Sequence, residues 1–177
     1  MHSFRTEAIV IKRRNFGEAD RILTVVTPHH GKVKIKAPGV RKISSKRSSH
    51  IELLNHSVLN LHSGKMLILT EAETLHHYSG LKNDLHKSGL SFYVCELLDG
   101  LLPENQENIA VFNLLKKILG DLEAKDNHRL IINKFEQELL TLLGFWPKER
   151  VFLENPDQFI ENLMEKKFKT KTILHRL

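Results

Sequence analysis

The chain has 177 residues, of which 41% are hydrophobic and 27% charged, and its formal net charge is +6 at pH 7. This length can bury a real core in one or two small domains. Because Cys95 is the single cysteine, an internal disulfide framework and a thiolate zinc site are excluded. Neither a signal peptide nor the roughly 20 apolar residues of a membrane span are visible, so the cytoplasm is the expected compartment and no membrane partner is expected.

The positive charge is concentrated in the first part of the chain. Residues 1–80 hold 13 Lys and Arg against 6 Asp and Glu, a balance of +7, whereas residues 81–177 hold 14 against 15, a balance of −1. This uneven distribution indicates a dedicated basic surface in the N-terminal part, which makes an acidic partner plausible.

Residues up to about 75 have the pattern of short β-strands. Strands are predicted over residues 6–13, 21–27, 32–37, 51–61 and 65–72. Gly31 suits a turn that needs a positive φ, Pro38 and Gly39 end the third strand, and residues 40–50 form a loop without periodicity. Short strands with one long loop fit a small closed barrel of the OB type, and an SH3-like barrel is the structural alternative.

After residue 75 the apolar period changes to that of helices. Helices are predicted over residues 79–102, 107–119, 127–143 and 157–164, with Gly120 and Gly144 ending the second and third. The tail is expected to return Phe168, Ile173, Leu174 and Leu177 to the core. The predicted fold class is therefore α+β: an N-terminal OB-fold β-barrel over residues 1–78, followed by an all-helical C-terminal domain over residues 79–177.

The strongest site candidate is a basic segment. Residues 32–47 contain seven basic residues and no acidic one. Lysines at 32, 34 and 36 alternate with apolar residues, so they are expected to face outward from a half-buried strand. With the mobile basic loop expected after them, they would follow a phosphate backbone, although a solvated charged surface is the alternative. The candidate nucleic-acid-binding residues are Arg13, Arg14, Arg21, Lys32, Lys34, Lys36, Arg41, Lys42, Lys46 and Arg47.

No motif for catalysis or for a cofactor is found. The sequence SGKM at residues 63–66 lacks the upstream glycine and the following Ser or Thr of a phosphate-binding loop. Carboxylate pairs such as Glu71 and Glu73 have no recognisable catalytic partners, and the histidines show no metal-ligand spacing. The chain is therefore expected not to be an enzyme and to hold no cofactor and no metal.

A corner and a basic tail near the C-terminus suggest a second binding site. Residues 145–147 read Phe-Trp-Pro, and several lysines follow between residues 166 and 171. An apolar pocket rimmed by lysines would accept an acidic peptide with a hydrophobic end. The candidate residues of this partner site are Trp146, Lys167, Lys169 and Lys171.

Residues 7–49 carry a pattern that resembles the N-terminal domain of the RecO family, bacterial recombination mediators in DNA repair. The shared elements are the strand AIVI, the motif FGEADR, a TPxxGK turn, the break AxGxRK and a loop rich in Ser and Arg. LTEAE at residues 69–73 also fits, LLGFWP at residues 142–147 looks like the family's helix end, and FKTK at residues 168–171 is similar to its C-terminal segment. The resemblance thus covers most of the chain.

The resemblance implies an OB-fold barrel with a helical domain that binds single- and double-stranded DNA and anneals complementary strands at the bacterial nucleoid. It also implies that RecR helps the protein load RecA onto DNA coated by single-strand-binding protein (SSB), whose acidic C-terminal tail docks on the helical domain. Many family members carry a four-cysteine zinc module after the corner at residues 145–147, but residues 150–155 hold no cysteine, so no zinc is expected. On the residues alone, a scaffold that binds RNA or an acidic protein is the alternative function.

Overall fold

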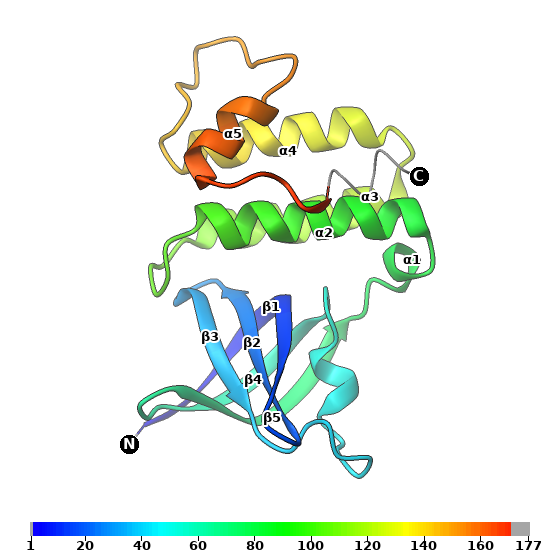
Figure 1. Cartoon of the computed structure of the whole chain (residues 1–177), viewed down its shortest axis with the longest axis vertical. Coiled ribbons are helices and arrows are strands. Elements are labelled where there is room, and N and C mark those ends of the chain that lie inside the picture. Colours follow the sequence, from blue (N-terminus) through cyan, green and yellow to red (C-terminus); the bar gives the residue numbers. More distant parts are fainter. Residues whose placement is uncertain (1, 171–177) are drawn as a thin grey trace. The chain divides into compact units, whose positions relative to one another are not determined.

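The chain folds into two compact units in the computed structural model, which describes residues 2–170 (Figure 1). Met1–Tyr78 and Pro103–Phe112 form the first, called here the barrel unit, and Ser79–Leu102 with Asn113–Leu177 form the second, the helical unit. The predicted division between residues 78 and 79 did not include the return of Pro103–Phe112 to the barrel. That return changes the surroundings of several basic residues.

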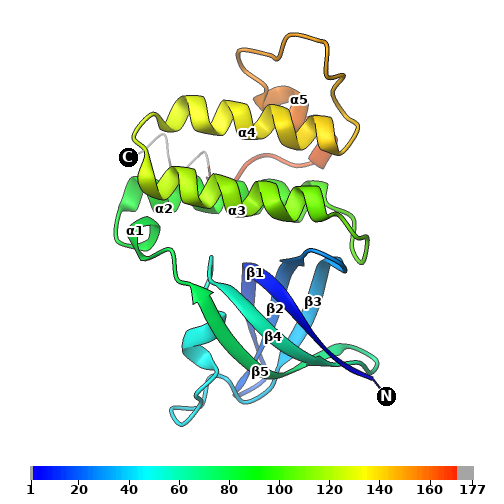
Figure 2. The same ribbon diagram turned by 180° about the vertical axis from the view of Figure 1, so that it is seen from behind.

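Five strands close into a barrel. They are β1 (Ser3–Phe16), β2 (Asp20–Thr27), β3 (Gly31–Ala37), β4 (His56–His62) and β5 (Leu67–His76). β1, β2 and β3 form an antiparallel meander, and β5 joins β3 through a short parallel contact. β4 pairs with both β5 and β1 and so closes the ring (Figure 2). The predicted OB-fold barrel followed by a helical domain is confirmed.

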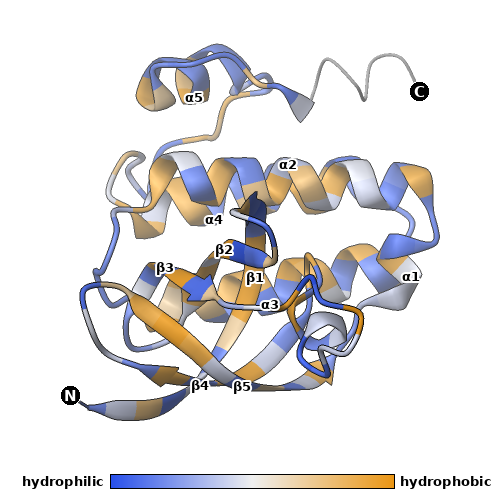
Figure 3. Cartoon of the chain, turned by 60° about the horizontal axis from the view of Figure 1, so that its bottom comes forward, coloured by the Kyte–Doolittle hydropathy of each residue, from blue (hydrophilic) through white to orange (hydrophobic). Residues whose placement is uncertain are grey.

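The barrel interior is apolar. On β3, Val33, Ile35 and Ala37 are buried, as their alternation with lysines predicted. Figure 3 shows hydrophobic and hydrophilic residues mixed along the strands. The interior cluster consists of Ala8, Val10, Leu23, Val25, Val33, Ile35, Ala37, Val40, Ile51, Leu59, Leu61 and Leu69. Because Val40 and Ile51 belong to the connection between β3 and β4, that long loop is anchored in the core at both of its ends.

The fourth strand begins later than predicted. Residues 48–51 form a short 3₁₀ helix (η1, Ser48–Ile51), and β4 starts at His56 instead of Ile51. The reason is a tight turn at Leu54, which has a φ of 70°. The Leu54 N–H donates to the Val10 carbonyl at 2.8 Å, and the Asn55 side-chain amide donates to the Ser49 carbonyl at 2.9 Å. These bonds replace the strand pairing that an extended segment would make.

The helical unit contains most of the helical residues. The helices are α1 (Ser79–Lys82), α2 (Leu85–Leu101), α3 (Ile109–Ala124), α4 (His128–Leu142) and α5 (Asp157–Met164). The single helix predicted over residues 79–102 is interrupted because Asp84 caps α2, accepting the Lys87 N–H at 2.9 Å. The prediction that Gly120 ends its helix is wrong, since α3 continues to Ala124 and buries Leu122. Gly144, with a φ of 79°, does end the turn that follows α4.

One buried polar pair lies in the helical interior. The Tyr93 hydroxyl donates to a Glu136 carboxylate oxygen at 2.5 Å, and both side chains are buried. Burial, followed by the charge of Glu136, raises the pKa of Tyr93. Cys95 is buried, and burial raises the pKa of its thiol to about 12. Cys95 therefore behaves as a small core residue.

The tail returns to the helical core at Phe168, as predicted. Phe168 is buried and packs edge-to-face against Tyr93, with ring centroids 5.1 Å apart. Glu96 of α2 accepts the backbone N–H groups of Lys169 at 2.8 Å and Thr170 at 3.0 Å, as well as the Thr170 hydroxyl. The remaining expected tail contacts, at residues 173, 174 and 177, lie outside the described residues.

Acidification is expected to loosen residues 168–170. Burial alone would raise the pKa of Glu96, but the hydrogen bonds from Lys169 and Thr170 hold that pKa below its usual value. A carboxyl group with a lowered pKa stabilises the folded state above its unfolded pKa of about 4.3, and this contribution is lost as the pH falls through the folded pKa. Hydrogen-exchange protection of the amides of Lys169 and Thr170 should therefore fall at acid pH. In Glu96→Gln the protection of these amides should be weak already at pH 7. The exposed control Glu165→Gln should be protected like the wild type. Equal protection in Glu96→Gln and the wild type would contradict the role of Glu96 in holding residues 168–170.

Candidate nucleic-acid interface

The β3–β4 loop is tied to the β1–β2 turn at its start. Asp20 accepts the Gly39 N–H at 2.8 Å and lies 3.1 Å from the Lys36 ammonium. The Gly39 N–H, then Lys36, hold the pKa of Asp20 below its usual value. Arg41 donates its backbone N–H to the Ala19 carbonyl at 2.9 Å and its guanidinium to the Gly17 carbonyl at 3.1 Å. The FGEADR and AxGxRK motifs are therefore joined, and Asp20 and Arg41 have a positioning role.

The lysines of β3 do not form the open comb that was predicted. Lys32 is buried, and its carbonyl accepts the Asn105 N–H at 2.9 Å. The Lys34 ammonium pairs with Glu104 at 2.5 Å, with about half of each side chain exposed. Both partners come from the returning segment Pro103–Phe112. The expectation that Lys32 faces solvent is wrong because this segment covers the strand.

Three predicted arginines have partners within the barrel unit. Arg13 pairs with Glu52 at 2.7 Å, and Arg21 donates to the Asn15 side-chain oxygen at 3.3 Å. Arg47 donates to the Leu69 carbonyl at 2.8 Å and to the Pro38 carbonyl at 2.7 Å. Arg47 therefore clips the loop to β5 and to the end of β3. These contacts do not support a loop that is free along its whole length.

Three other predicted residues are exposed. Within residues 2–170, Arg14, Lys42 and Lys46 make no ion pair. Lys42 and Lys46 lie on the loop, where Ile43 is fully exposed. The strand register places Arg14 and Lys36 on either side of Ile22, so both cations belong to one row across β1, β2 and β3. Exposed cations on a loop and a neighbouring row are suited to phosphate contacts.

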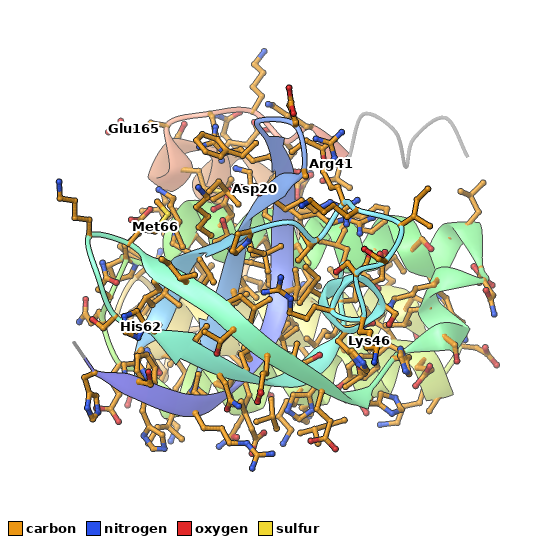
Figure 4. All side chains as sticks on the ribbon, turned by 90° about the horizontal axis from the view of Figure 1, so that it is seen from below. Asp20, Arg41, Lys46, His62, Met66 and Glu165 are labelled. Atoms are coloured by element: carbon orange, nitrogen blue, oxygen red, sulfur yellow. The ribbon has the colours of Figure 1, made fainter. Side chains whose placement is uncertain are left out.

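A cleft of about 450 Å³ lies beside the end of the loop. It is lined by Arg5, Lys46, Arg47, His50, Val58, Asn60, Glu71, Ala72 and Glu73. Figure 4 labels Lys46 there and Asp20 and Arg41 near the start of the loop. No local pattern singles out Arg5, His50 or Asn60. Strand pairing brings Arg5 and Asn60 together, since Arg5 lies opposite Asn60 and Asn60 opposite Glu71, and His50 joins them from η1, where it contacts Thr74 of β5.

Trp146, a residue of the predicted partner site, is buried in the corner that follows α4. Trp146 is only 6% exposed, donates its indole N–H to the Arg150 carbonyl at 3.2 Å, and packs against Phe152 and Phe159. It is a core residue of its corner and is not an exposed anchor. Lys167 and Lys169 are exposed, and Lys171 lies outside the described residues.

The helical unit carries a different pocket, between α3 and α4. Its volume is about 300 Å³, and Leu114, Ile118, Leu130, Ile131 and Phe135 supply its apolar lining. Lys117, Lys125 and Lys134 stand at its rim. Glu138 pairs with Lys117 at 3.6 Å and Asp121 with Lys125 at 2.6 Å, whereas Lys134 makes no ion pair within the described part of the chain.

Neither a metal-binding cluster nor a membrane-spanning helix is found in the described part of the chain. Between residues 2 and 170, no three or more His, Cys, Asp or Glu side chains are placed to hold a metal ion. No helix in the same range has the length and apolar character needed to cross a membrane.

The fold and the basic loop define an OB-fold protein with an attached helical domain. The family model described as Recombination protein O N terminal matches residues 1–78, and the one described as Recombination protein O C terminal matches residues 82–150. The chain belongs to the RecO family.

Curated relatives match across both units. The chain is 38% identical over 150 residues to a protein of Dehalococcoides mccartyi named DNA repair protein RecO, and the match covers 84% of the chain and 59% of the relative. Proteins of the same name from Roseiflexus sp. and Symbiobacterium thermophilum are 39% and 34% identical, with 82% and 83% of the chain and 51% and 59% of the relatives covered. The chain thus spans little more than half the length of these relatives.

Proposed function

We propose that the chain is a DNA-binding recombination mediator that acts in DNA repair at the bacterial nucleoid without covalent chemistry. Its family and the names of its relatives support the repair role. The single observation that carries the binding role is the exposed loop, where Lys42 and Lys46 make no ion pair within residues 2–170. Phosphate contacts by such residues serve single- and double-stranded DNA alike, because they require no particular base sequence.

The ion pairs of the other basic residues do not prevent phosphate contacts. Lys34 with Glu104 is about half exposed, and such pairs contribute only about 0–1 kcal/mol. A phosphate can therefore replace the carboxylate as the partner of the ammonium group. Lys36 and Arg14 then join the loop cations, which extends the basic surface across β1 and β3.

Annealing of complementary strands needs little beyond this surface. Two single strands repel each other through their phosphates, and cations that neutralise these phosphates remove part of the repulsion. The loop and the row of Arg14 and Lys36 supply cations from separate elements of one small barrel. We propose that strands held there meet in close apposition. Family membership alone supports RecR as a partner in loading RecA.

The α3–α4 pocket is the better candidate for docking the acidic tail of SSB. Its apolar lining suits a hydrophobic chain end, and its lysine rim suits acidic side chains. Lys134→Glu is expected to weaken binding of an SSB tail peptide about tenfold, because one charge-assisted contact is lost and a repulsive one is added. Fluorescence anisotropy of a labelled tail peptide measures the change. The exposed control Lys148→Glu should bind like the wild type, and an equal loss in both variants would contradict this pocket.

An annealing assay tests the main proposal. Complementary tailed oligonucleotides are coated with the cognate SSB, and the rate of duplex formation is measured with and without the chain. A clear acceleration is expected. Parallel titrations with single-stranded DNA, double-stranded DNA, RNA and the tail peptide at several salt concentrations separate the alternatives. Binding of the peptide alone would favour a protein-binding scaffold over a DNA-binding mediator.

A further inference from the structure

The cleft beside the β3–β4 loop is built from strand residues and loop residues together. Arg5 on β1, Asn60 on β4 and Glu71 on β5 form one row across the sheet. Lys46 and Arg47 of the loop line the same cleft. Two strand spacings, roughly 10 Å, separate β1 from β5. The cleft, with a volume of about 450 Å³, therefore extends over three strands and has cations at the β1 side and at the loop side.

The loop side of the cleft has cations without counter-ions. Arg47 is half-buried, yet within residues 2–170 its guanidinium contacts only carbonyl oxygens and no carboxylate. Two of its five N–H donors are used in these bonds. Lys46 makes no ion pair in the same range. A partly desolvated cation without a counter-ion, as Arg47 is within the described chain, is unfavourable unless an anion joins it.

His50 adds a neutral donor to this side. The Thr74 N–H donates to His50 Nδ1 at 3.2 Å, and the Thr74 hydroxyl lies 2.9 Å from the same nitrogen. Nδ1 is therefore the acceptor, and the neutral imidazole carries its proton on Nε2. Within the described chain this Nε2 makes no hydrogen bond. Lys46, Arg47 and His50 together offer donors that suit a phosphate.

The β5 side of the cleft offers acceptors. Glu71 accepts a hydrogen bond from the Asn60 side-chain amide at 2.5 Å. The Glu73 carboxylate lies 3.5 Å from the Arg5 guanidinium, and the side chains of Glu73 and Arg5 are largely exposed. Carboxylates repel phosphates but accept hydrogen bonds from the exocyclic amino group of a base, as Glu and Asp do with cytosine N4. A group that presents a phosphate at one end and an amino-bearing base edge at the other matches this arrangement.

We propose that the cleft binds a nucleotide of single-stranded DNA, with its phosphate on Lys46 and Arg47 and its base edge toward Glu71 and Glu73. This inference rests on the proposed DNA-binding function. Cytosine, adenine and guanine carry exocyclic amino groups and thymine does not. The barrel therefore favours amino-bearing bases over thymine, although it binds the backbone without sequence preference elsewhere.

Anisotropy titrations with dC and dT oligonucleotides of equal length test the proposal. The wild type is expected to bind the dC strand about fivefold more tightly, the factor that about one net hydrogen bond supplies. The double variant Glu71→Val with Glu73→Val should lose this preference. If that variant fails to fold, Glu71→Gln with Glu73→Gln replaces it in the test. This second variant keeps the size of both side chains and should reduce the preference for the dC strand. Lys46→Ala should weaken the binding of both oligonucleotides alike. Lys65→Ala, which lies outside the cleft lining, should weaken their binding less.

The outcomes separate this inference from the function on which it depends. Equal binding of the dC and dT strands by the wild type would overturn the cleft assignment alone. A preference that survives removal of both carboxylates in a folded variant would also overturn it. Failure of the wild type to bind any oligonucleotide at low salt would overturn the proposed function and the cleft with it.

Discussion

Gly31→Ala is expected to lower the stability of the barrel unit by about 3 kcal/mol, the sum of backbone strain and lost contacts. Gly31 has a φ of 65°, and an added methyl carbon would lie 1.8 Å from the backbone carbonyl oxygen of Gln106. A backbone atom cannot rotate aside, so Pro103–Phe112 or the β2–β3 turn has to move. That movement breaks the 2.9 Å bond from the Asn105 N–H to the Lys32 carbonyl.

Thermal denaturation measures this effect. For a chain of this size, 3 kcal/mol corresponds to a decrease in Tm of about 6–12 °C. Gly17→Ala is the matched control, since Gly17 has a similar φ of 57° but no atom within 4 Å of the added carbon. It should show the backbone strain alone, about 1 kcal/mol. Equal decreases in both variants would mean that the contact with Gln106 contributes nothing.

Local pattern predicted the parts of the fold that depend on neighbours in sequence. The alternation along β3 placed Val33, Ile35 and Ala37 inside, and Gly144 marked the end of the turn after α4. Both outcomes follow from periodicity and backbone conformation within a few residues. The late start of β4 was missed because the left-handed Leu54 is not a glycine and leaves no mark in the sequence pattern.

The surroundings of the basic residues depended on distant segments. Glu104 reaches Lys34 across 70 positions, and Leu69 supplies the carbonyl that holds Arg47. Neither contact has a local signal, so the sequence could not separate the candidates with partners from those without. The packing of Phe152 and Phe159 against Trp146 likewise was not predicted from the sequence. Composition located the basic surface, but three-dimensional contacts were needed to separate cations with partners from those without.

The double reversal Lys42→Glu with Lys46→Glu is expected to weaken single-stranded DNA binding about 25-fold at 0.1 M salt. Each phosphate contact contributes about 0.7 to the slope of log K against log salt for single strands, so losing two lowers the slope by about 1.4. Relative to 1 M salt, where the phosphate contacts contribute little, 0.1 M is a tenfold lower concentration. Over this tenfold range, a slope change of about 1.4 lowers the affinity by about 25-fold. Folding should be unaffected, because both side chains are exposed and make no ion pair within residues 2–170.

A control of equal net charge decides whether position or total charge matters. Lys65→Glu with Lys148→Glu changes the net charge by the same amount, and both side chains are exposed. If the loop is the DNA interface, this control should leave the salt slope nearly unchanged and lower the affinity by only a few-fold, since neither lysine belongs to the loop and charges without a phosphate contact act only through a screened field. An equal loss in both double variants would show that binding follows net charge alone.

Arg13, which has a partner in the barrel unit, is expected to respond differently from the loop lysines. Arg13→Gln breaks its 2.7 Å pair with Glu52 and should affect thermal stability more than DNA affinity.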